Sequence, residues 1–227
     1  MTPPALQAVS LYRFFRAGDE ETQALRGVSV AVEPGELVAV AGPSGSGKST
    51  LLSCLAGLDT PDGGMVHVAG QRLSHRPERE RTRLRARHIG LLFQSANLLD
   101  HFSVDANLAL VQALIPRPAG STPAQRRLAL LRSLDIEQRS TARPSTLSGG
   151  EAARAGLAVA LANDPAVLLA DEPTGEVDAD TEHQIVGLLR ARADAGTAVV
   201  VVSHSAALAS AADRVIRLED GKIDDAA

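Results

Sequence analysis

Residues 42–49 have the types and the spacing of a loop that binds phosphate. They fit the pattern G-x-x-x-x-G-K-[ST] between a strand expected over residues 37–41 and a helix expected over residues 49–56. Glycine lets successive backbone N–H groups point at phosphate oxygens, and the positive end of the helix dipole adds to the attraction. In such loops the lysine neutralises the β- and γ-phosphates and the next hydroxyl binds magnesium. The candidate nucleotide ligands are Gly42, Pro43, Ser44, Gly45, Ser46, Gly47, Lys48, Ser49 and Thr50, with Ser49 also a magnesium ligand.

The lysine in this loop supports the phosphate-binding interpretation. Only two of the 23 basic residues are lysines, Lys48 and Lys222. An ammonium is a compact point charge, whereas a guanidinium is a wide planar fork. A glycine-rich turn before a helix, without a ligand, is the alternative, and it leaves the use of lysine unexplained.

Two adjacent acids, Asp171 and Glu172, follow an apolar strand expected over residues 166–170. In a doubly wound sheet the carboxyl end of such a strand lies beside the phosphate loop. Side chains alternate along a strand, so the two acids point differently and can have different roles. We expect Asp171 to bind magnesium and Glu172 to orient or deprotonate the attacking water. An acidic turn at a strand end is the alternative, because the sequence continues with Pro173, Thr174 and Gly175.

A third polar segment, Leu147 to Glu151, precedes a helix expected over residues 151–162. Ser148 and Glu151 have the spacing of a capping box, in which each side chain binds the backbone N–H of the other residue. That role does not use the two glycines, Gly149 and Gly150. Glycines at a helix N-terminus let a phosphate approach bare N–H groups.

The elements that position these motifs alternate between buried strands and helices, which predicts a doubly wound α/β fold with a mostly parallel sheet. Further strands are expected over residues 28–32, 65–69, 89–93 and 197–202, and a closing hairpin around Asp220 and Gly221. The stretch between residues 93 and 166 is too long for one crossover. We therefore expect a single domain over residues 1–227 with a helical lobe inserted at about residues 96–150.

Composition narrows the function. The net charge of −4 argues against nucleic acid as a partner. One cysteine, Cys54, excludes an intrachain disulfide and fits a reducing cytoplasm. The N-terminus lacks a secretion signal, and no apolar run approaches the roughly 20 residues that span a bilayer. If the protein works at a membrane, another subunit must cross it.

The run from Arg72 to Arg87 contains seven arginines moderated by Glu78 and Glu80. It could contact lipid headgroups or a partner. A solvated surface helix is the favoured interpretation.

In order and spacing, these motifs resemble those of the ABC (ATP-binding cassette) ATPases over essentially the whole chain, most of all the macrolide-exporter and lipoprotein-release branch. The resemblance implies a P-loop NTPase fold with an N-terminal antiparallel β subdomain and the inserted helical lobe. It implies ATP and Mg²⁺ as cofactors and hydrolysis to ADP and phosphate. It also implies that Ser148, Gly149 and Gly150 contact the γ-phosphate of ATP bound to the opposite subunit of a head-to-tail dimer.

The resemblance assigns roles to three further residues. Gln94, after the strand over residues 89–93, is similar to the glutamine that binds magnesium and contacts the membrane partner. Asp178 resembles the aspartate that crosses the dimer interface. His204 follows the strand over residues 197–202 and resembles the histidine that contacts the γ-phosphate. With Lys48 and Glu172, His204 and Gln94 complete the expected catalytic set.

The aromatic residue that stacks on adenine aligns with Phe15, and Tyr12 or Phe14 is the alternative. These three residues lie together, although the chain has only five aromatic residues. Such a cluster in an aromatic-poor chain favours a stacking role.

The sequence departs from the family pattern near the dimer-forming motifs. No residue with a chemical role is missing, so we still predict ATP hydrolysis. We expect the departures to affect how well the two subunits fit at the dimer interface and how fast ATP is turned over. The departures are Ala152, Ala153 and Val159 in the signature helix, Glu176 and Val177 before Asp178, and Ser205 after His204.

The resemblance therefore implies an ATPase subunit, cytoplasmic and peripheral on the inner face of the cell membrane, that powers a separate membrane-spanning permease. Its partners would be that permease, docked around residues 94–111, and a second ABC ATPase subunit, identical or different. The system would be an exporter or one that handles lipids, lipoproteins or peptides. One alternative is a regulatory ATPase that drives a non-transporting cell-division or cell-wall complex. Another is a soluble ABC ATPase acting on ribosomes or DNA, which usually carries two cassettes or long inserts.

Overall fold

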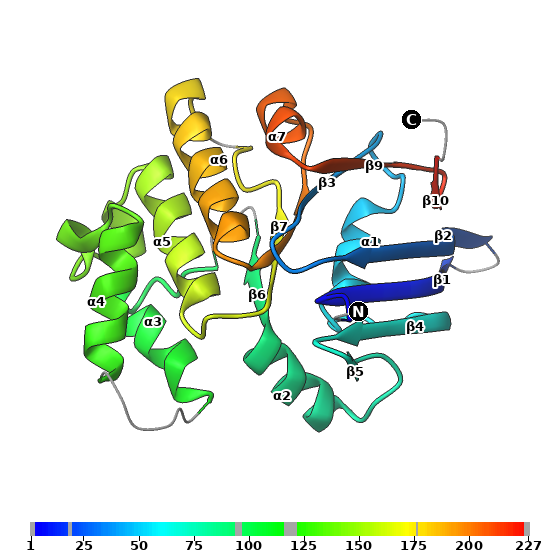
Figure 1. The fold of residues 1–227 in the computed structure, drawn as a ribbon, viewed down its shortest axis with the longest axis horizontal. Helices are drawn as coiled ribbons and strands as arrows, with labels where there is room; N and C mark the ends of the chain where they lie inside the picture. The colour runs from blue at the N-terminus through cyan, green and yellow to red at the C-terminus, as the bar shows by residue number, and fades with distance from the viewer. Residues whose placement is uncertain (1–2, 18–19, 94–96, 116–121, 176, 225–227) are drawn as a thin grey trace.

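A computed structural model describes residues 3–17, 20–93, 97–115, 122–175 and 177–224. Within these ranges no helix combines the length and the apolar character needed to cross a membrane. Figure 1 shows helices α3, α4 and α5 gathered at one end of the molecule and strands β1, β2 and β4 at the other. Strands β1, β2 and β4 belong to an antiparallel sheet, and a mostly parallel sheet lies between it and the three helices (Figure 1).

In the described part of the chain, the central sheet has six strands in the order β10-β9-β3-β8-β7-β6. Five strands pair in parallel, and the short β10 pairs with β9 in an antiparallel hairpin. This confirms the predicted α/β sheet. The strands are β3 (Leu37–Ala41), β6 (Ile89–Leu92), β7 (Val167–Asp171), β8 (Ala198–Val202), β9 (Arg214–Glu219) and β10 (Lys222–Ile223).

Alternate residues of the central strands face two separate cores, as the two-residue period of a strand requires. Val38 and Val200 belong to a core with helix α1 (Lys48–Leu55) and the antiparallel sheet. Leu37 and Val201 belong to a second core with α5 (Gly149–Leu161), α6 (Ala179–Asp194) and α7 (Ala206–Ala211). The sheet therefore separates α1 from α5.

The antiparallel sheet has the strand order β2-β1-β4-β5. Its strands are β1 (Leu6–Ala17), β2 (Glu20–Val32), β4 (Gly63–Val68) and β5 (Gln71–Arg72). Our sequence analysis placed strands only over residues 28–32 and 65–69, so it missed β1 and most of β2. The reason is irregular pairing: the register shifts between Ala8 and Leu11 and again after Arg13, and Ser10 has a φ of 48°. Such bulges interrupt the alternation that identifies a strand.

The arginine run is divided between two elements. Arg72 ends β5, and α2 spans Glu78–His88. None of the residues of α2, all of which the structure describes, is fully buried. This is the exposed helix that the sequence favoured.

The segment between β6 and β7 is mainly helical, as expected. It contains α3 (Val104–Ala113), α4 (Pro123–Ser133), two short 3₁₀ helices (Glu137–Arg139 and Pro144–Thr146) and the start of α5. Ser103 caps α3, and Thr122 with Gln125 forms a capping box on α4. Buried leucines such as Leu108 and Leu131 join this lobe to the second core.

Candidate nucleotide-binding site

The loop after β3 has a backbone that requires glycine. Gly47 is the N-cap of α1 with a φ of 101°, and a Cβ there would lie 2.3 Å from the carbonyl oxygen of Ala24. A Cβ on Gly42 would lie 2.0 Å from the carbonyl oxygen of Leu218. Among the residues that the structure describes, no side chain caps α1 at Gly47. The first N–H groups of this helix therefore remain available to an anion.

Lys48, the first residue of α1, has only 8% of its surface exposed. Its Nζ donates to the carbonyl oxygens of Gly42 and Pro43, each at 2.8 Å. The Ser46 hydroxyl is also buried and has no hydrogen-bond partner among the described residues. A buried ammonium and an unpaired hydroxyl beside free helix N–H groups fit a phosphate group.

Asp171 ends β7 and faces the start of α1. Asp171 and Ser49 line one cavity. Burial and the neighbouring charge of Glu172 raise the pKa of Asp171, while Ser49 and Lys48 oppose that rise. A hydroxyl and a carboxylate are the hard oxygen ligands that Mg²⁺ uses together with phosphate oxygens, typically with one or two carboxylates. Ser49 and Asp171 thus fit the predicted magnesium site.

Glu172 follows in a left-handed conformation, with a φ of 46°. Its backbone N–H donates to the carbonyl of Val202 at 2.9 Å, which joins it to the end of β8. Its Oε2 accepts from the Ser203 hydroxyl at 3.2 Å and from the His204 backbone N–H at 3.4 Å. The His204 Nε2 lies 3.5 Å from Glu172 Oε1. The two strand ends therefore hold the acid and the histidine side by side.

Ser203 was missed by our sequence analysis. Its signal was present: it is the first polar residue after the all-apolar β8 and immediately precedes His204. Its hydroxyl also accepts from the backbone N–H of Ser205 at 3.1 Å. Ser203 thus orients Glu172 and the turn that carries His204.

A cavity of about 340 Å³ brings most of these residues together. Of the three candidate aromatic residues, Phe15 lines it, whereas Tyr12 packs against Gly27 and Gly63. Gly42 and Pro43 line an adjoining hollow that also includes His204. Gln94 lies outside the described residues. The cavity is lined by Phe15, Ala24, Ser44, Gly45, Gly47, Lys48, Ser49, Thr50, Asp171, Glu172, Val202 and His204.

The segment around Ser148 forms the predicted capping box. Ser148 Oγ accepts from the Glu151 N–H at 3.3 Å, and Glu151 Oε2 accepts from the Ser148 N–H at 2.8 Å. Arg139 forms an ion pair with Glu151 at 3.0 Å. The helix begins at Gly149, two residues earlier than expected, so both glycines belong to its first turn. The early start follows from the box itself, because the N-cap residue sets where helical geometry begins.

Asp178 caps α6 beside this segment. Its carboxylate accepts from the backbone N–H of Thr181 at 3.0 Å and from the Thr181 hydroxyl at 2.8 Å, and these bonds lower its pKa. A Cβ on Gly150 would lie 2.6 Å from Cγ2 of Thr181, so glycine allows α5 and α6 to approach closely. Among the described residues that line the cavity at Lys48, neither the segment from Ser148 to Gly150 nor Asp178 appears.

Three of the departures from the family pattern have structural roles. Val159 is 8% exposed in the second core, where the arginine that the family commonly has at this position would have to be buried. Ala153 packs against the same core. Ser205 caps α7 by accepting from the Leu208 N–H at 3.1 Å.

The comparisons with known proteins agree with this geometry. The profile of the ABC transporter family matches residues 25–175. The chain is 41% identical over 226 residues to the macrolide export ATP-binding/permease protein MacB of Burkholderia thailandensis, covering 98% of this chain but only 34% of MacB. It is 41% identical over 225 residues to the lipoprotein-releasing system ATP-binding protein LolD of Ruegeria pomeroyi, covering 98% of both.

Solved structures give the same result. The ATP-binding cassette MJ0796, in a dimeric post-hydrolysis state bound to ADP and Pi, has a TM-score of 0.88 and 34% identity, with 96% of each chain covered. The cassette cbiO1 of Clostridium perfringens, part of the ABC transporter complex cbiONQ, has a TM-score of 0.85 and 25% identity, covering 98% of this chain and 87% of cbiO1. These matches confirm the resemblance and its macrolide-exporter and lipoprotein-release branch. The chain belongs to the ABC transporter family, of which it is an ATPase cassette.

Proposed function

We propose that this chain binds ATP with Mg²⁺ and hydrolyses it to power a membrane-spanning permease of an export system or one that handles lipids, lipoproteins or peptides. The observation that carries the proposal is the convergence of the Lys48 ammonium, the Ser49–Asp171 pair and the Glu172–His204 pair on one cavity. These groups are the parts that phosphoryl transfer to water requires.

Each residue has a defined task in this mechanism. Lys48 exchanges the carbonyls of Gly42 and Pro43 for the β- and γ-phosphate oxygens. Glu172, oriented by Ser203, accepts a proton from the water that attacks the γ-phosphorus, while the bond to the ADP oxygen breaks. His204, with 61% of its side chain exposed, donates to the γ-phosphate as charge develops on it. Ser49 and Asp171 would hold Mg²⁺, which would neutralise charge on the phosphates.

The docking surface for the permease is proposed to be the loop before α3 and the exposed side of that helix. A large patch of exposed apolar side chains on a protein surface often marks a site that binds a partner. Asn107, only 3% exposed, accepts from the Leu99 N–H at 2.8 Å and donates to the Ser103 carbonyl at 3.0 Å, which holds the loop in shape. The exposed apolar side chains of this surface are Leu99, Phe102, Leu110 and Leu114.

The relatives support this assembly. The printed name of MacB combines ATP binding and a permease, and LolD is named as the ATP-binding protein of a releasing system. ABC cassettes dimerise, as in the dimeric MJ0796 structures. The proposed partners are therefore a second cassette subunit and a permease, with this chain peripheral on the cytoplasmic face of the membrane.

Calorimetric titration of the purified chain with ATP, with and without magnesium, tests the proposal. We expect magnesium-dependent binding in the wild type and an affinity reduced by about a hundredfold in Lys48→Ala, because a charge-assisted phosphate contact is lost. Lys222→Ala is the matched control, since it removes the other, exposed lysine. Equal ATP affinity in the wild type and Lys48→Ala contradicts the proposal.

A further inference from the structure

We propose that Arg13 is a positioning residue for Phe15, holding that ring ready to stack on the base of the bound nucleotide; this inference rests on the proposed ATP-binding function. The Arg13 Cζ lies 4.8 Å from the centroid of the Phe15 ring. This is within the roughly 6 Å over which a guanidinium attracts an aromatic face. The guanidinium lies over one face of the ring, and Phe15 also lines the cavity at Lys48. The proposal therefore assigns the opposite face to adenine.

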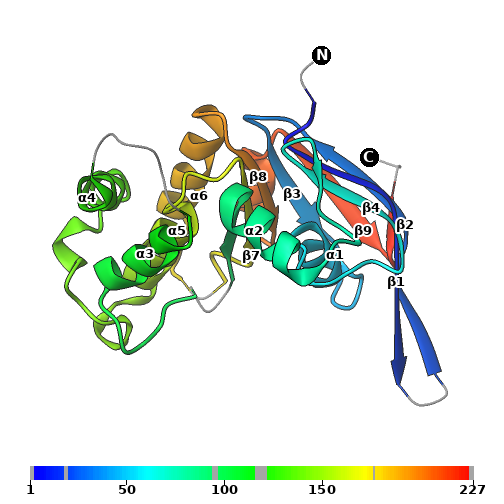
Figure 2. The same ribbon diagram turned by 90° about the horizontal axis from the view of Figure 1, so that it is seen from below.

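Phe15 needs such support because of where it lies. It is 44% exposed, and it belongs to the β1–β2 hairpin, which projects beyond the rest of the antiparallel sheet (Figure 2). An exposed ring on a projecting hairpin has few contacts to hold it in one orientation. Ordering it only when the ligand arrives would weaken binding, whereas a ring held in advance avoids that cost.

Arg13 is itself fixed by two carboxylates. Its Nε donates to Asp59 Oδ2 at 2.8 Å and its Nη1 to Asp62 Oδ2 at 3.1 Å. Asp62 Oδ2 also accepts from the Phe14 N–H at 2.8 Å, and the Asp62 N–H donates to the Tyr12 carbonyl at 2.8 Å. The guanidinium and the backbone on both sides of it are thus tied to one loop. Arg13 is 21% exposed, so these ion pairs are only partly screened.

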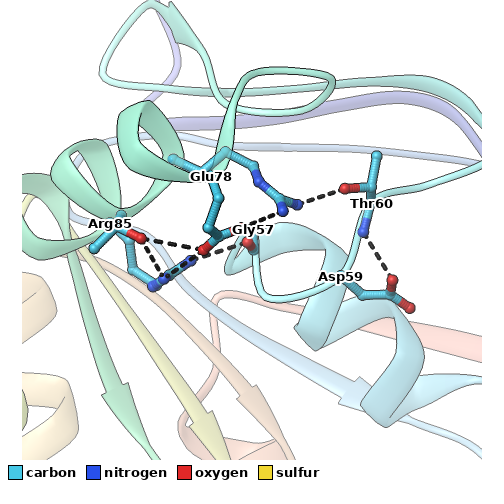
Figure 3. A network of polar contacts seen from close by, with 7 residues as sticks. Gly57, Asp59, Thr60, Glu78 and Arg85 are labelled. Atoms are coloured by element: carbon cyan, nitrogen blue, oxygen red, sulfur yellow. Dashed lines mark hydrogen bonds and ion pairs between the residues drawn. The ribbon is translucent and has the colours of Figure 1, made fainter.

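This loop, residues 57–62, is anchored from its other side by α2. Arg85 Nη1 donates to the Gly57 carbonyl at 2.9 Å, and Arg81 Nη1 donates to the Thr60 hydroxyl. Glu78 accepts from both arginines (Figure 3). Two members of the arginine run therefore hold the loop that holds Arg13. This gives part of the run a role that its charge alone did not suggest.

The loop also follows α1 directly. The N-terminus of α1 belongs to the phosphate loop, and its C-terminal end leads into Gly57 to Asp62. Helix α1 therefore connects the phosphate loop to residues 57–62, the loop whose carboxylates hold Arg13 beside Phe15. The arrangement fits a nucleotide whose triphosphate and aromatic base are bound together, and it assigns the base contribution to Phe15 as oriented by Arg13.

The test is calorimetric titration of the full chain with Mg·ATP and, separately, with inorganic triphosphate and magnesium. The variants are Arg13→Gln, Phe15→Ala and the two combined, with Arg72→Gln as the control for loss of an exposed arginine from the same sheet. We expect Phe15→Ala to weaken ATP binding about tenfold or more. We expect Arg13→Gln to weaken it roughly fivefold. Neither change should alter triphosphate binding, and Arg13→Gln should have no further effect in the Phe15→Ala background.

Asp59→Asn is a second test variant in case Arg13→Gln does not fold. It weakens the Arg13–Asp59 ion pair while keeping the shape of the side chain. It should also reduce ATP affinity and leave triphosphate affinity unchanged. The inference is overturned if Arg13→Gln and Asp59→Asn bind ATP as the wild type does, or if the loss persists in the Phe15→Ala background or extends to triphosphate. Failure of the wild type to bind ATP is a different result, which contradicts the proposed function itself.

Discussion

Two segments of this cassette have the backbone to receive a phosphate, and they differ in how complete they are. Around Lys48, the buried ammonium and the Asp171 carboxyl, whose pKa is raised, line one cavity. The buried Ser46 hydroxyl of the same loop has no hydrogen-bond partner among the described residues. Around Ser148, the polar groups satisfy one another in a capping box, and Ser148 and Gly149 are exposed. We propose that the first segment is a site within one chain and that the second becomes a site only against another surface.

The fold explains why the two segments do not meet. Alternate residues of β3, β7 and β8 pack on opposite sides, with α1 on one side and α5 on the other. Within one chain, the segment around Ser148 therefore begins a helix that packs in the other core, and its described residues do not line the cavity at Lys48. A head-to-tail pair of chains can bring the two segments together, and the related MJ0796 cassette bound to ADP and Pi is dimeric.

The largest expected effect comes from the complete segment. In Glu172→Gln, turnover should fall about a thousandfold, because the group that accepts the proton from water is lost while its shape remains. ATP binding should be retained, and the variant should accumulate as an ATP-bound dimer. Phosphate release and size-exclusion chromatography with ATP measure the two effects. Wild-type turnover in this variant would remove Glu172 from the mechanism.

The incomplete segment should respond differently to loss of a helix cap. Ser148→Ala and Ser103→Ala each remove an N-cap hydroxyl, so each should reduce the free energy of unfolding by about 1 kcal/mol. Only Ser148→Ala should also reduce turnover, by about tenfold or more, because only that hydroxyl would contact the partner's nucleotide. Chemical denaturation and phosphate release measure these changes. Equal turnover in both variants would mean that Ser148 only caps α5.

The smallest expected effect is on how the stability of the fold depends on pH, through Asp171 in the segment around Lys48. The pKa of Asp171 is raised, first by burial, so between the ordinary carboxyl value of about 4 and that raised value the folded chain binds more protons than the unfolded chain. Unliganded stability should therefore fall as pH rises through this window. Asp171→Asn should raise the melting temperature at pH 7 and have little effect in acid.

Asp213 is the matched control with the opposite sign. The hydrogen bond from Arg190, followed by that from the Leu37 N–H, lowers the pKa of Asp213. Its stabilisation is present above the ordinary carboxyl pKa and is lost as pH falls through the lowered value. Asp213→Asn should therefore lower the melting temperature at pH 7. If Asp171→Asn also lowers the melting temperature at pH 7, the charged Asp171 carboxylate does not destabilise the fold, which contradicts this prediction.

The sequence predicted well those features that depend on local patterns. The phosphate loop, the two acids at the end of β7 and the capping box at Ser148 are all set by neighbouring residues, and each was expected where the structure has it. Features that depend on distant contacts were missed. Strand β1 was not predicted because its bulges interrupt the alternation of buried and exposed residues. The Arg13–Asp59 pair was not predicted because its residues are 46 positions apart. Ser203 could have been found from its place after β8, but its contact with Glu172 spans 31 positions.

The most direct test of the two-segment account mixes two inactive variants. Lys48→Ala disables the complete segment, and Ser148→Arg disables the incomplete one by placing a bulky side chain at the helix N-terminus. If each site uses one segment from each chain, a mixed dimer has one intact site. The mixture should then recover phosphate release to about a quarter of wild-type turnover, because random pairing makes half of the dimers mixed. A mixture that stays as inactive as its two components would contradict the account.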